Sequence, residues 1–291
     1  MTRKYLKMVY AGITKLVDTI VSILTIFLFS SFKAAREIRR ISDNSCKNAF
    51  VLGNGPSLND ILEKEERLDE ILDGHSIVMN NFGNSKFFTV VRPVYYILLD
   101  PGFYNEQLIE EREDYQRLYQ NLHHVDWSMS LFLVHGANWQ LVQSKVDNPN
   151  VCVRLFNGTK AVGFNWFQVL SYKWNLGIPS SRNVIIPALQ LMINMGYKQI
   201  YLYGAEFSWT KNIDVDPENN KVFLNDSHFY NKTDIVYYNN GWYKWYLEAV
   251  VEMLDGTERI ASYADEMKVK IFNRTKGSFI DAFEYENPDN L

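Results

Sequence analysis

The 291-residue sequence contains only two cysteines, Cys46 and Cys152, and neither belongs to a CxxC motif or lies beside histidines at a metal-ligand spacing. Isolated cysteines exclude a disulfide-stapled scaffold and do not indicate a zinc site. Such sparse cysteine usage fits a reducing, cytosolic environment.

Near its N-terminus the sequence lacks a hydrophobic run of membrane-spanning length. The uncharged run from Thr19 to Phe32 is 14 residues, whereas a spanning helix needs roughly 20. Residues 1–40 contain eight Lys or Arg but only Asp18 and Glu37, a net charge of +6, so residues 41–291 carry −10. Basic residues flank the run on both sides, which indicates that both of its ends stay on one side of a membrane.

Residues 1–40 are therefore predicted to form a helix that lies in, or dips into, the cytoplasmic leaflet, with its cations on anionic head groups. A short spanning anchor, a cleaved signal peptide and a buried hairpin are the alternatives. The signal peptide is disfavoured because Ser30-Ser31-Phe32-Lys33, which follows the run, is a poor cleavage site.

After residue 41, short apolar segments typical of strands alternate with helical segments, and 47% hydrophobic residues suffice for a sizeable core. This alternation predicts an α/β fold, a single Rossmann-like domain over residues 41–291 with a mainly parallel sheet. The expected strands are Asn48–Gly53, Ser76–Asn80, Tyr95–Leu99, Ser130–His135, Val151–Phe156, Gln199–Gly204 and Val269–Asn273. The clearest helices are expected at Phe103–Leu122, Asn183–Met195 and Gly241–Leu254.

The first expected strand runs directly into a glycine-rich turn, Gly53-Asn54-Gly55-Pro56-Ser57. Two glycines allow the backbone to approach a ligand, and the helix that follows offers free N–H groups and a positive dipole end to a phosphate. Ser57 or Asn59 is expected to cap that helix. The turn matches neither the Walker pattern nor GxGxxG, so an ordinary strand-to-helix turn is the alternative.

Polar residues also follow other expected strands. Asn80 and Asn81 follow the second strand, Asp100 the third, and Gly204 and Glu206 follow the late strand Gln199–Gly204. Parallel sheets bind ligands at the carboxyl ends of their strands, where these side chains suit a base and a ribose. Turns favour the same residue types, which is the alternative explanation.

A long polar stretch at about 208–240 shows little helix or strand signal and is predicted to be a lid. It contains His228, a candidate general base, in a loop with aromatic neighbours. Among its aromatic residues, Tyr230, Tyr237 and Tyr238 are the best candidates to face a ligand. Its DxD at Asp214–Asp216 is a weak metal-binding signal, because such motifs usually stand at a strand end.

Taken in order, several motifs resemble those of the bacterial CMP-sialic acid sialyltransferases of glycosyltransferase family 42 and the fold group around them. The resemblance covers roughly residues 48–285. The motifs are VLGNGPSL at 51–58, NNF at 80–82, LDPGFY at 99–104, GYKQIYLYGAEF at 196–207, NDSHFY at 225–230 and RTKGSFIDAF at 274–283.

The resemblance implies a GT-A-variant, Rossmann-like domain with a lid that transfers a sugar with inversion and needs no metal or other cofactor. In that reading His228 deprotonates the acceptor hydroxyl, and Tyr230, Tyr237 or Tyr238 hydrogen-bonds the leaving phosphate. The residues expected to bind the nucleotide are Gly53, Asn54, Gly55, Ser57, Asn80, Asn81, Asp100, Gly204 and Glu206.

Three features depart from the family. Asp100 replaces an asparagine, which leaves the identity and placement of the donor open. Arg182 and Asn183 are only stand-ins for an Arg-Ile-Thr-Ser-Gly run near the sugar. The anchor also lies at the N-terminus, where those sialyltransferases have none.

Asp-Pro after the third strand also occurs in a related family found in flagellin-glycosylation proteins and in a pterin diphosphokinase. A Mg²⁺-dependent diphosphokinase is therefore the rival activity, with the DxD or Asp100 and Glu206 as metal ligands. A non-catalytic nucleotide- or glycan-binding module is a third class.

The leading interpretation is a transferase on the cytoplasmic face of a bacterial inner membrane, peripheral or monotopic. It would move a sugar, for example a nonulosonic acid from a CMP donor, to a surface glycan or lipid-linked acceptor. The expected partners are the nucleotide-sugar donor, a glycan or glycolipid acceptor and the membrane surface, but not nucleic acid; a homo-oligomer stays open.

Overall fold

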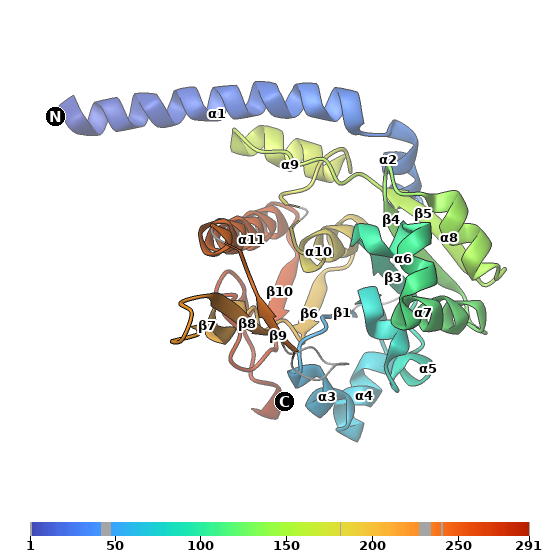
Figure 1. Cartoon of the computed structure of the whole chain (residues 1–291). Helices are drawn as coiled ribbons and strands as arrows, with labels where there is room; N and C mark the ends of the chain where they lie inside the picture. Colours follow the sequence, from blue (N-terminus) through green and yellow to red (C-terminus); the bar gives the residue numbers. More distant parts are fainter. Residues whose placement is uncertain (1, 42–47, 181, 227–233, 240, 291) are drawn as a thin grey trace.

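The structure, a computed structural model, describes residues 2–41, 48–180, 182–226, 234–239 and 241–290. Eight strands form one sheet in the order β11-β10-β6-β1-β2-β3-β4-β5, and every neighbouring pair is parallel (Figure 1). The predicted α/β class with a mainly parallel sheet is therefore confirmed. The strands are β1 Asn48–Leu52, β2 His75–Met79, β3 Tyr95–Leu98, β4 Met129–Val134, β5 Val151–Phe156, β6 Gln199–Tyr203, β10 Lys270–Asn273 and β11 Glu284–Tyr285.

Helices cover both faces of this sheet, and each face has its own apolar core. One core joins β1 and β6 to α2, α9, α10 and α11, and the other joins β1 to β4 with α3 to α8. Alternate residues of one strand enter opposite cores: Val51 lies in the first and Phe50 in the second. The helices are α2 Phe32–Arg39, α3 Ser57–Leu62, α4 Glu65–Leu72, α5 Phe88–Val91, α6 Glu106–Glu111, α7 Glu113–His123, α8 Trp139–Val146, α9 Asn165–Lys173, α10 Ile185–Asn194 and α11 Trp242–Glu266.

The strand order reverses at β1. The chain runs outward from β1 through β2, β3 and β4 to β5, then crosses back to place β6 on the other side of β1. At such a topological switch point the loops leave adjacent strands in opposite directions, which opens a crevice at their carboxyl ends. The turns after β1 and β6 therefore flank the position where this fold class binds ligands.

Two expected helices are each broken in two. The segment expected as Phe103–Leu122 contains a 3₁₀ turn, η2 Pro101–Tyr104, followed by α6 and α7, because Arg112 between these helices has an extended backbone. The helix after the glycine-rich turn is likewise divided into α3 and α4 at Lys64, which is also extended.

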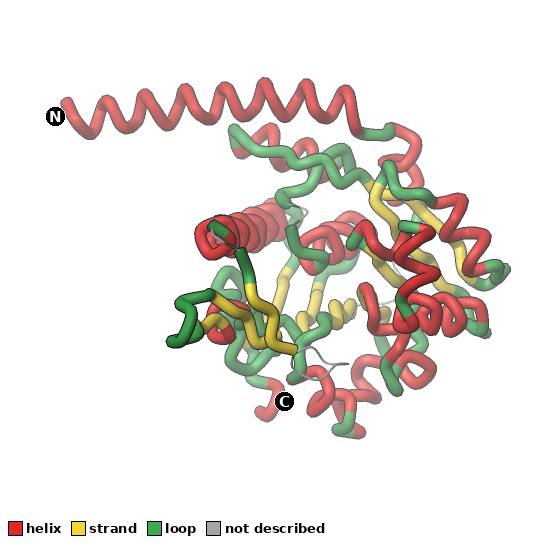
Figure 2. Tube along the Cα trace, viewed as in Figure 1, coloured by secondary structure: helices red, strands yellow, loops and turns green. Residues whose placement is uncertain are grey.

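The stretch at about 208–240, which shows little helix or strand signal in the sequence, contains regular structure, and its role as a lid stays a prediction. After the 3₁₀ turn η3 (Trp209–Asn212), strands β7 Ile213–Val215, β8 Val222–Asp226 and β9 Asp234–Tyr237 form a small antiparallel sheet (Figure 2). These strands are three to five residues long, which is too short for an alternating pattern to be visible in the sequence. The Asp216 side chain accepts a hydrogen bond from Glu218 N (2.9 Å) and one from Asn219 Nδ2 (2.6 Å), and so orders the hairpin turn.

The N-terminal segment is two helices rather than one. The first, α1 Thr2–Phe29, has 28 residues, and α2 begins after Ser31, whose extended backbone and side-chain bond to Ala34 N cap it. Within α1, Tyr5–Phe29 is long and apolar enough to cross a membrane by length and composition alone. The 14-residue uncharged run therefore underestimates the length of the apolar helix.

Candidate active site

The turns after β1 and β6 are hydrogen-bonded to each other at the switch point. Gly53 N donates to Tyr203 O and Gly55 N donates to Gly204 O, both at 2.8 Å. A Cβ atom on Gly55 would overlap the Glu206 carboxylate and lie 2.7 Å from Gly204 O. Glycine is needed here because the two backbones touch, which gives the predicted glycine-rich turn a specific structural reason.

Glu206 joins this turn to the start of α3. Its Oε1 accepts a hydrogen bond from Ser57 N at 2.8 Å, although the two residues are 149 positions apart in the sequence. The N-cap residue of α3 is Pro56, which makes no side-chain cap bond, and the expected cap Ser57 has no hydrogen-bond partner for its Oγ among the described residues. A carboxylate thus occupies the helix start that the sequence assigned to a phosphate.

Three side-chain oxygens in this region are buried and have no hydrogen-bond partner within the described part of the chain. They are Asn54 Oδ1, Ser57 Oγ and Glu206 Oε2. The amide nitrogen of Asn54 is held by Met79 O at 3.1 Å, so this side chain bridges the turn to the end of β2. Buried acceptors without partners are uncommon in folded proteins and mark a place where a ligand or water completes the hydrogen bonding.

The turn after β10 supports the Glu206 loop. Thr275 Oγ1 accepts a hydrogen bond from Ala205 N (3.1 Å), Ser278 Oγ donates to Ala205 O (2.6 Å), and Phe279 N donates to Glu206 O (2.8 Å). These residues belong to the motif RTKGSFIDAF, whose position was recognised in the sequence but whose role was not. Their contacts hold the loop that carries Glu206.

Arg274 in the same turn is buried and fully paired. Its side chain is 4% exposed, binds Glu70 at 2.7 Å and Glu286 at 2.6 Å, and donates to the Tyr203 hydroxyl at 2.9 Å. Burial opposes its charge, but these bonds outweigh burial and raise the pKa of the guanidinium. This cation ties the β6 and β10 ends to α4 and is committed to the fold.

The two asparagines after β2 have internal roles. Asn80 has a left-handed backbone (φ 47°), its carbonyl accepts from the Tyr96 hydroxyl, and its Oδ1 accepts from Leu99 N at 3.4 Å. Asn81 is 5% exposed and donates to Asp114 on α7 at 2.9 Å. Asn80 thus links the ends of β2 and β3, and Asn81 links the end of β2 to α7.

Asp100 lies exposed at the end of β3 and caps η2 by accepting from Gly102 N at 2.8 Å. Burial and then the charge of Asp100 raise the pKa of Tyr104. Arg112, which was not singled out from the sequence, places a half-exposed guanidinium near this end of the sheet and is held by Asp114 at 2.8 and 3.0 Å. The hydrogen bond to Asp114 raises the pKa of Arg112, and the charge of Asp100, which only the tertiary structure brings near, adds to this shift.

Arg182 and Asn183 precede α10. Asn183 Oδ1 accepts from Ile185 N at 2.7 Å, so this residue orders the start of α10. Arg182 donates to Glu252 of α11 at 3.0 Å, and Lys160 binds the other oxygen of Glu252 at 2.6 Å. Burial raises the pKa of Glu252, but the bonds from Lys160 and Arg182 outweigh it and the net shift is downward.

Among the lid residues predicted to act on the substrate, the side chain of Tyr238 is described. Its ring stacks on Trp242, at the start of α11, with 3.7 Å between the ring centroids. His228 and Tyr230 lie outside the described residues, as does the side chain of Tyr237, whose backbone belongs to β9. The two carboxylates of the DxD bind the backbone and side chain of their own hairpin. Among the residues that the structure describes, no group of three or more His, Cys, Asp or Glu side chains could hold a metal ion.

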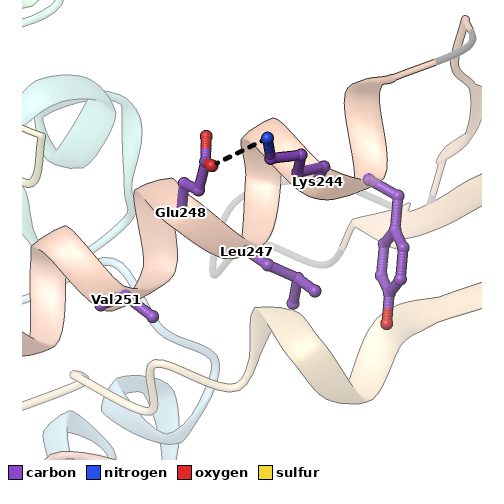
Figure 3. A pocket seen from close by; sticks show the side chains of 5 residues that line it. Lys244, Leu247, Glu248 and Val251 are labelled. Atoms are coloured by element: carbon purple, nitrogen blue, oxygen red, sulfur yellow. Dashed lines mark ion pairs between the residues drawn. The ribbon is translucent and has the colours of Figure 1, made fainter.

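A hollow of about 420 Å³ lies on the outer side of α11. Figure 3 shows Leu247 and Val251 along its apolar wall and the Lys244–Glu248 ion pair (3.6 Å) at its border. All of its lining residues come from one helix. It offers no polar side chains from the strand ends, so the turns at the carboxyl ends of β1 and β6 remain the candidate site.

Comparisons with known proteins bear on the fold. No protein-family model and no curated protein matches the chain. The structure is similar to that of the MAf glycosyltransferase from Magnetospirillum magneticum AMB-1, with a TM-score of 0.50 and 15% sequence identity over 84% of this chain. The similarity covers 34% of that chain, so this chain spans about a third of its neighbour's length. At this identity the likeness shows a shared fold.

Proposed function

We propose that this chain is an inverting, metal-independent glycosyltransferase that binds a nucleotide-sugar donor at the carboxyl ends of β1 and β6. The observation that carries the proposal is the set of three buried, unpartnered oxygens of Asn54, Ser57 and Glu206, within the described part of the chain, at the switch point. An unsatisfied buried polar group costs about 1–3 kcal/mol, and donor groups of a ligand would remove that cost. The glycosyltransferase fold neighbour supports a transferase in general terms.

The position of Glu206 suggests which end of the donor binds here. Its carboxylate lies at the start of α3, where its negative charge repels a phosphate. The free oxygen accepts hydrogen bonds from hydroxyl groups, which the ribose of a nucleotide supplies. In our proposal the nucleoside therefore binds against Glu206 and Ser57, and the phosphate lies further out, towards the lid.

The transfer step is a direct displacement in this proposal. The acceptor hydroxyl oxygen attacks the anomeric carbon of the donor sugar, and the bond from that carbon to the donor phosphate oxygen breaks. The phosphate leaves with the bonding electrons, and His228 takes the acceptor proton. The hydroxyl of Tyr230, Tyr237 or Tyr238 stabilises the leaving phosphate in place of a cation. This step rests on the sequence motif of the lid.

The family resemblance extends the proposal to a CMP-linked donor, for example a nonulosonic acid, and to a surface glycan or lipid-linked acceptor. Asp100 stands where the sialyltransferases have asparagine, so the proposal leaves the identity of the base and of the sugar open. A Mg²⁺-dependent diphosphokinase and a non-catalytic binding module are the competing classes.

A thermal-shift screen with CMP, UMP, GDP, UDP and ATP, each with and without Mg²⁺, tests the proposal, because a ligand that binds the folded state raises the melting temperature. We expect a shift with CMP that does not need Mg²⁺. A shift with ATP only when Mg²⁺ is present would overturn the transferase in favour of the diphosphokinase.

The variant Glu206→Gln tests the site itself. The amide keeps an oxygen for Ser57 N but replaces the free carboxylate oxygen with a donor, so nucleotide affinity should fall about tenfold or more. Glu248→Gln, on the exposed side of α11, is the matched control and should bind normally. Unchanged affinity in Glu206→Gln would place the nucleotide elsewhere.

A further inference from the structure

We propose that α1, α2 and α9 form one membrane-binding surface, on which α1 lies flat in the head-group region of an anionic bilayer and does not cross it. The surface is defined by the outward side of α1, the exposed basic residues of α2 and the segment after it, and the exposed row Trp166, Leu170 and Trp174 of α9 with its C-terminal cap. This inference concerns how the chain is held at a membrane and does not depend on the proposed function.

The two sides of α1 differ chemically. Lys7, Lys15, Asp18 and Ser22 recur at spacings of three, four and eight residues, so they share one stripe of the helix. The opposite side is apolar along the whole helix and at least half exposed, as shown by Leu6, Ile13, Val17, Ile20, Leu24 and Phe27. A continuous apolar side of this extent is typical of a helix that lies at a membrane surface.

Two hydroxyl side chains in the second half of α1, Thr19 and Ser22, bind the body of the protein. Ser22 Oγ donates to Val162 O and accepts from Val162 N, both at 3.0 Å, and Thr19 Oγ1 accepts from Phe164 N at 3.0 Å. Further along, Ser30 Oγ donates to Leu176 O at 2.7 Å. The second half of α1 is therefore docked along the segment from 157 to 164, with its apolar side facing away.

This docking leaves too little free helix to cross a bilayer. The undocked part, from Thr2 to Asp18, is about 25 Å long at 1.5 Å per residue, whereas the hydrocarbon core is about 30 Å thick. It also contains Lys4, Lys7 and Lys15. A spanning orientation would require the hydrogen bonds of Thr19 and Ser22 to the body to break.

The helix α9 extends the same surface. Phe164, just before α9, bonds to Thr19 of α1, and Leu176, just after α9, bonds to Ser30. The helix α9 therefore runs alongside the docked half of α1 (Figure 1). Trp166 is 64% exposed, and Leu170 and Trp174 are each 48% exposed. Exposed tryptophans beside an apolar helix fit the interfacial region of a bilayer, where an apolar ring and a polar N–H are both accommodated.

The charge distribution of the protein favours an anionic lipid membrane as the occupant of this surface. Lys33, Arg36, Arg39 and Arg40 are exposed, and the Arg39 guanidinium lies 5.0 Å from the Trp174 ring centre. Residues 41–291 carry a net charge of −10, which an anionic membrane repels. The basic cluster beside apolar side chains matches anionic head groups above acyl chains, and it orients the acidic body away from the membrane.

Co-sedimentation of the full chain with phosphatidylcholine vesicles, with and without 30% phosphatidylglycerol, tests the surface. We expect stronger binding to the anionic vesicles and a loss of about tenfold or more in Trp166→Ala/Trp174→Ala. Trp139→Ala is the matched control: Trp139 is 43% exposed but lies on α8, on the other face of the sheet, and should not matter. Circular dichroism checks that each variant is folded.

Binding that ignores phosphatidylglycerol, or an equal loss in Trp139→Ala, would overturn the surface. So would vesicle-independent dimerisation that disappears in Trp166→Ala/Trp174→Ala, because it would identify a second copy as the occupant. Both outcomes can be read without any transferase assay.

A single thiol tests the orientation of α1. In a Cys46→Ser/Cys152→Ser background, Lys4→Cys should react with a membrane-impermeant maleimide only from the side that holds the body. Labelling only from the opposite side would show a spanning helix and overturn the proposal. Lys244→Cys, exposed on α11, reports the side of the body in the same vesicles.

Discussion

Two apolar helices of this protein, α10 and α1, have opposite surroundings. Every residue of α10 from Ile185 to Ile193 is buried, between β1 and α11, whereas α1 buries Thr19, Ser22 and Ile26 and exposes its apolar side. The apolar helix in the core therefore meets protein on all sides, and the apolar helix at the edge meets protein through Thr19, Ser22 and Ile26 on one side. Apolar composition thus indicates that a helix leaves water, but not what it contacts instead.

Polar residues explain the difference between the two helices. In α10 the buried Gln190 donates from its Nε2 to Gly177 O at 2.8 Å, a bond that lies within the core, while its Oε1 has no hydrogen-bond partner among the described residues. In α1 the hydroxyls of Thr19 and Ser22 are the groups that bind the body. The predictions below compare substitutions on α1 with substitutions in the packed body.

The largest effect is expected for Leu189→Ala in the middle of α10. Leu189 has no exposed surface, so its truncation should leave a cavity and lower the free energy of unfolding by about 2–5 kcal/mol. Leu24→Ala on α1 removes the same atoms from a side chain that is 56% exposed, and it should change the free energy of unfolding by less than about 0.5 kcal/mol. Urea unfolding in a mild detergent measures both; equal losses would contradict the difference between the two helices.

Gly55→Ala should lower the free energy of unfolding by about 1–3 kcal/mol and abolish the melting shift produced by nucleotide, because the added Cβ overlaps the Glu206 carboxylate. Gly12→Ala in α1 is the control, since a Cβ there meets no atom within 4 Å. Alanine is also the better helix former, so that variant should be unchanged or up to about 1 kcal/mol more stable. Normal nucleotide binding by Gly55→Ala would move the binding site away from this turn.

Ser22→Ala should cost about 1 kcal/mol, because the Val162 N–H loses its acceptor and the Val162 carbonyl loses a donor. Thr14→Ala removes a hydroxyl that bonds only to Tyr10 O of its own helix and should have little effect. The hydrogen-exchange rate of the Val162 amide, which donates to Ser22 Oγ, measures this contact directly. Unaltered exchange in Ser22→Ala would show that α1 is not docked there.

The smallest effect is expected at low pH for Glu252→Gln. The folded-state pKa of Glu252 is lowered, so its contribution is present above the unfolded value of about 4.3 and is lost as the pH falls through the folded value. Glu252→Gln should therefore lower the free energy of unfolding at pH 7 by less than about 1 kcal/mol. Below about pH 4.5 the free energy of unfolding of this variant should fall less steeply with pH than that of the wild type. Glu248→Gln, whose ion pair is exposed, should retain the wild-type acid profile; an unchanged profile in Glu252→Gln would contradict the assignment.

Much of the sheet could be predicted from the sequence because strands of a parallel sheet are buried on both faces and form short continuous apolar runs. Each of the seven expected strands is present, with ends within one residue of the expected ends. The small sheet β7-β8-β9 was missed because its strands are short, carry polar residues and depend on pairing with each other. The breaks at Arg112 and Lys64 were missed because their helical neighbours have a continuous helical pattern.

The candidate site was only partly predictable. The glycine-rich turn and Glu206 were identified because each follows an apolar strand, and the structure brings them together at the switch point. The internal bonds of Asn81 to Asp114, and of Arg182 to Glu252, depend on helices distant in the sequence. The role of His228 stays a prediction, because it lies outside the described residues.

The sequence by itself determined the alternation of strands and helices, the amphipathic N-terminal helix and the glycine-rich turn, because local spacing and residue type are sufficient for these features. Only the tertiary structure decided that Glu206 occupies the start of α3, that Arg274 is committed to the fold, and that Thr19 and Ser22 of α1 are bound to the body. Each of these depends on contacts between residues far apart in the chain, whose burial and charge take effect only when the chain folds.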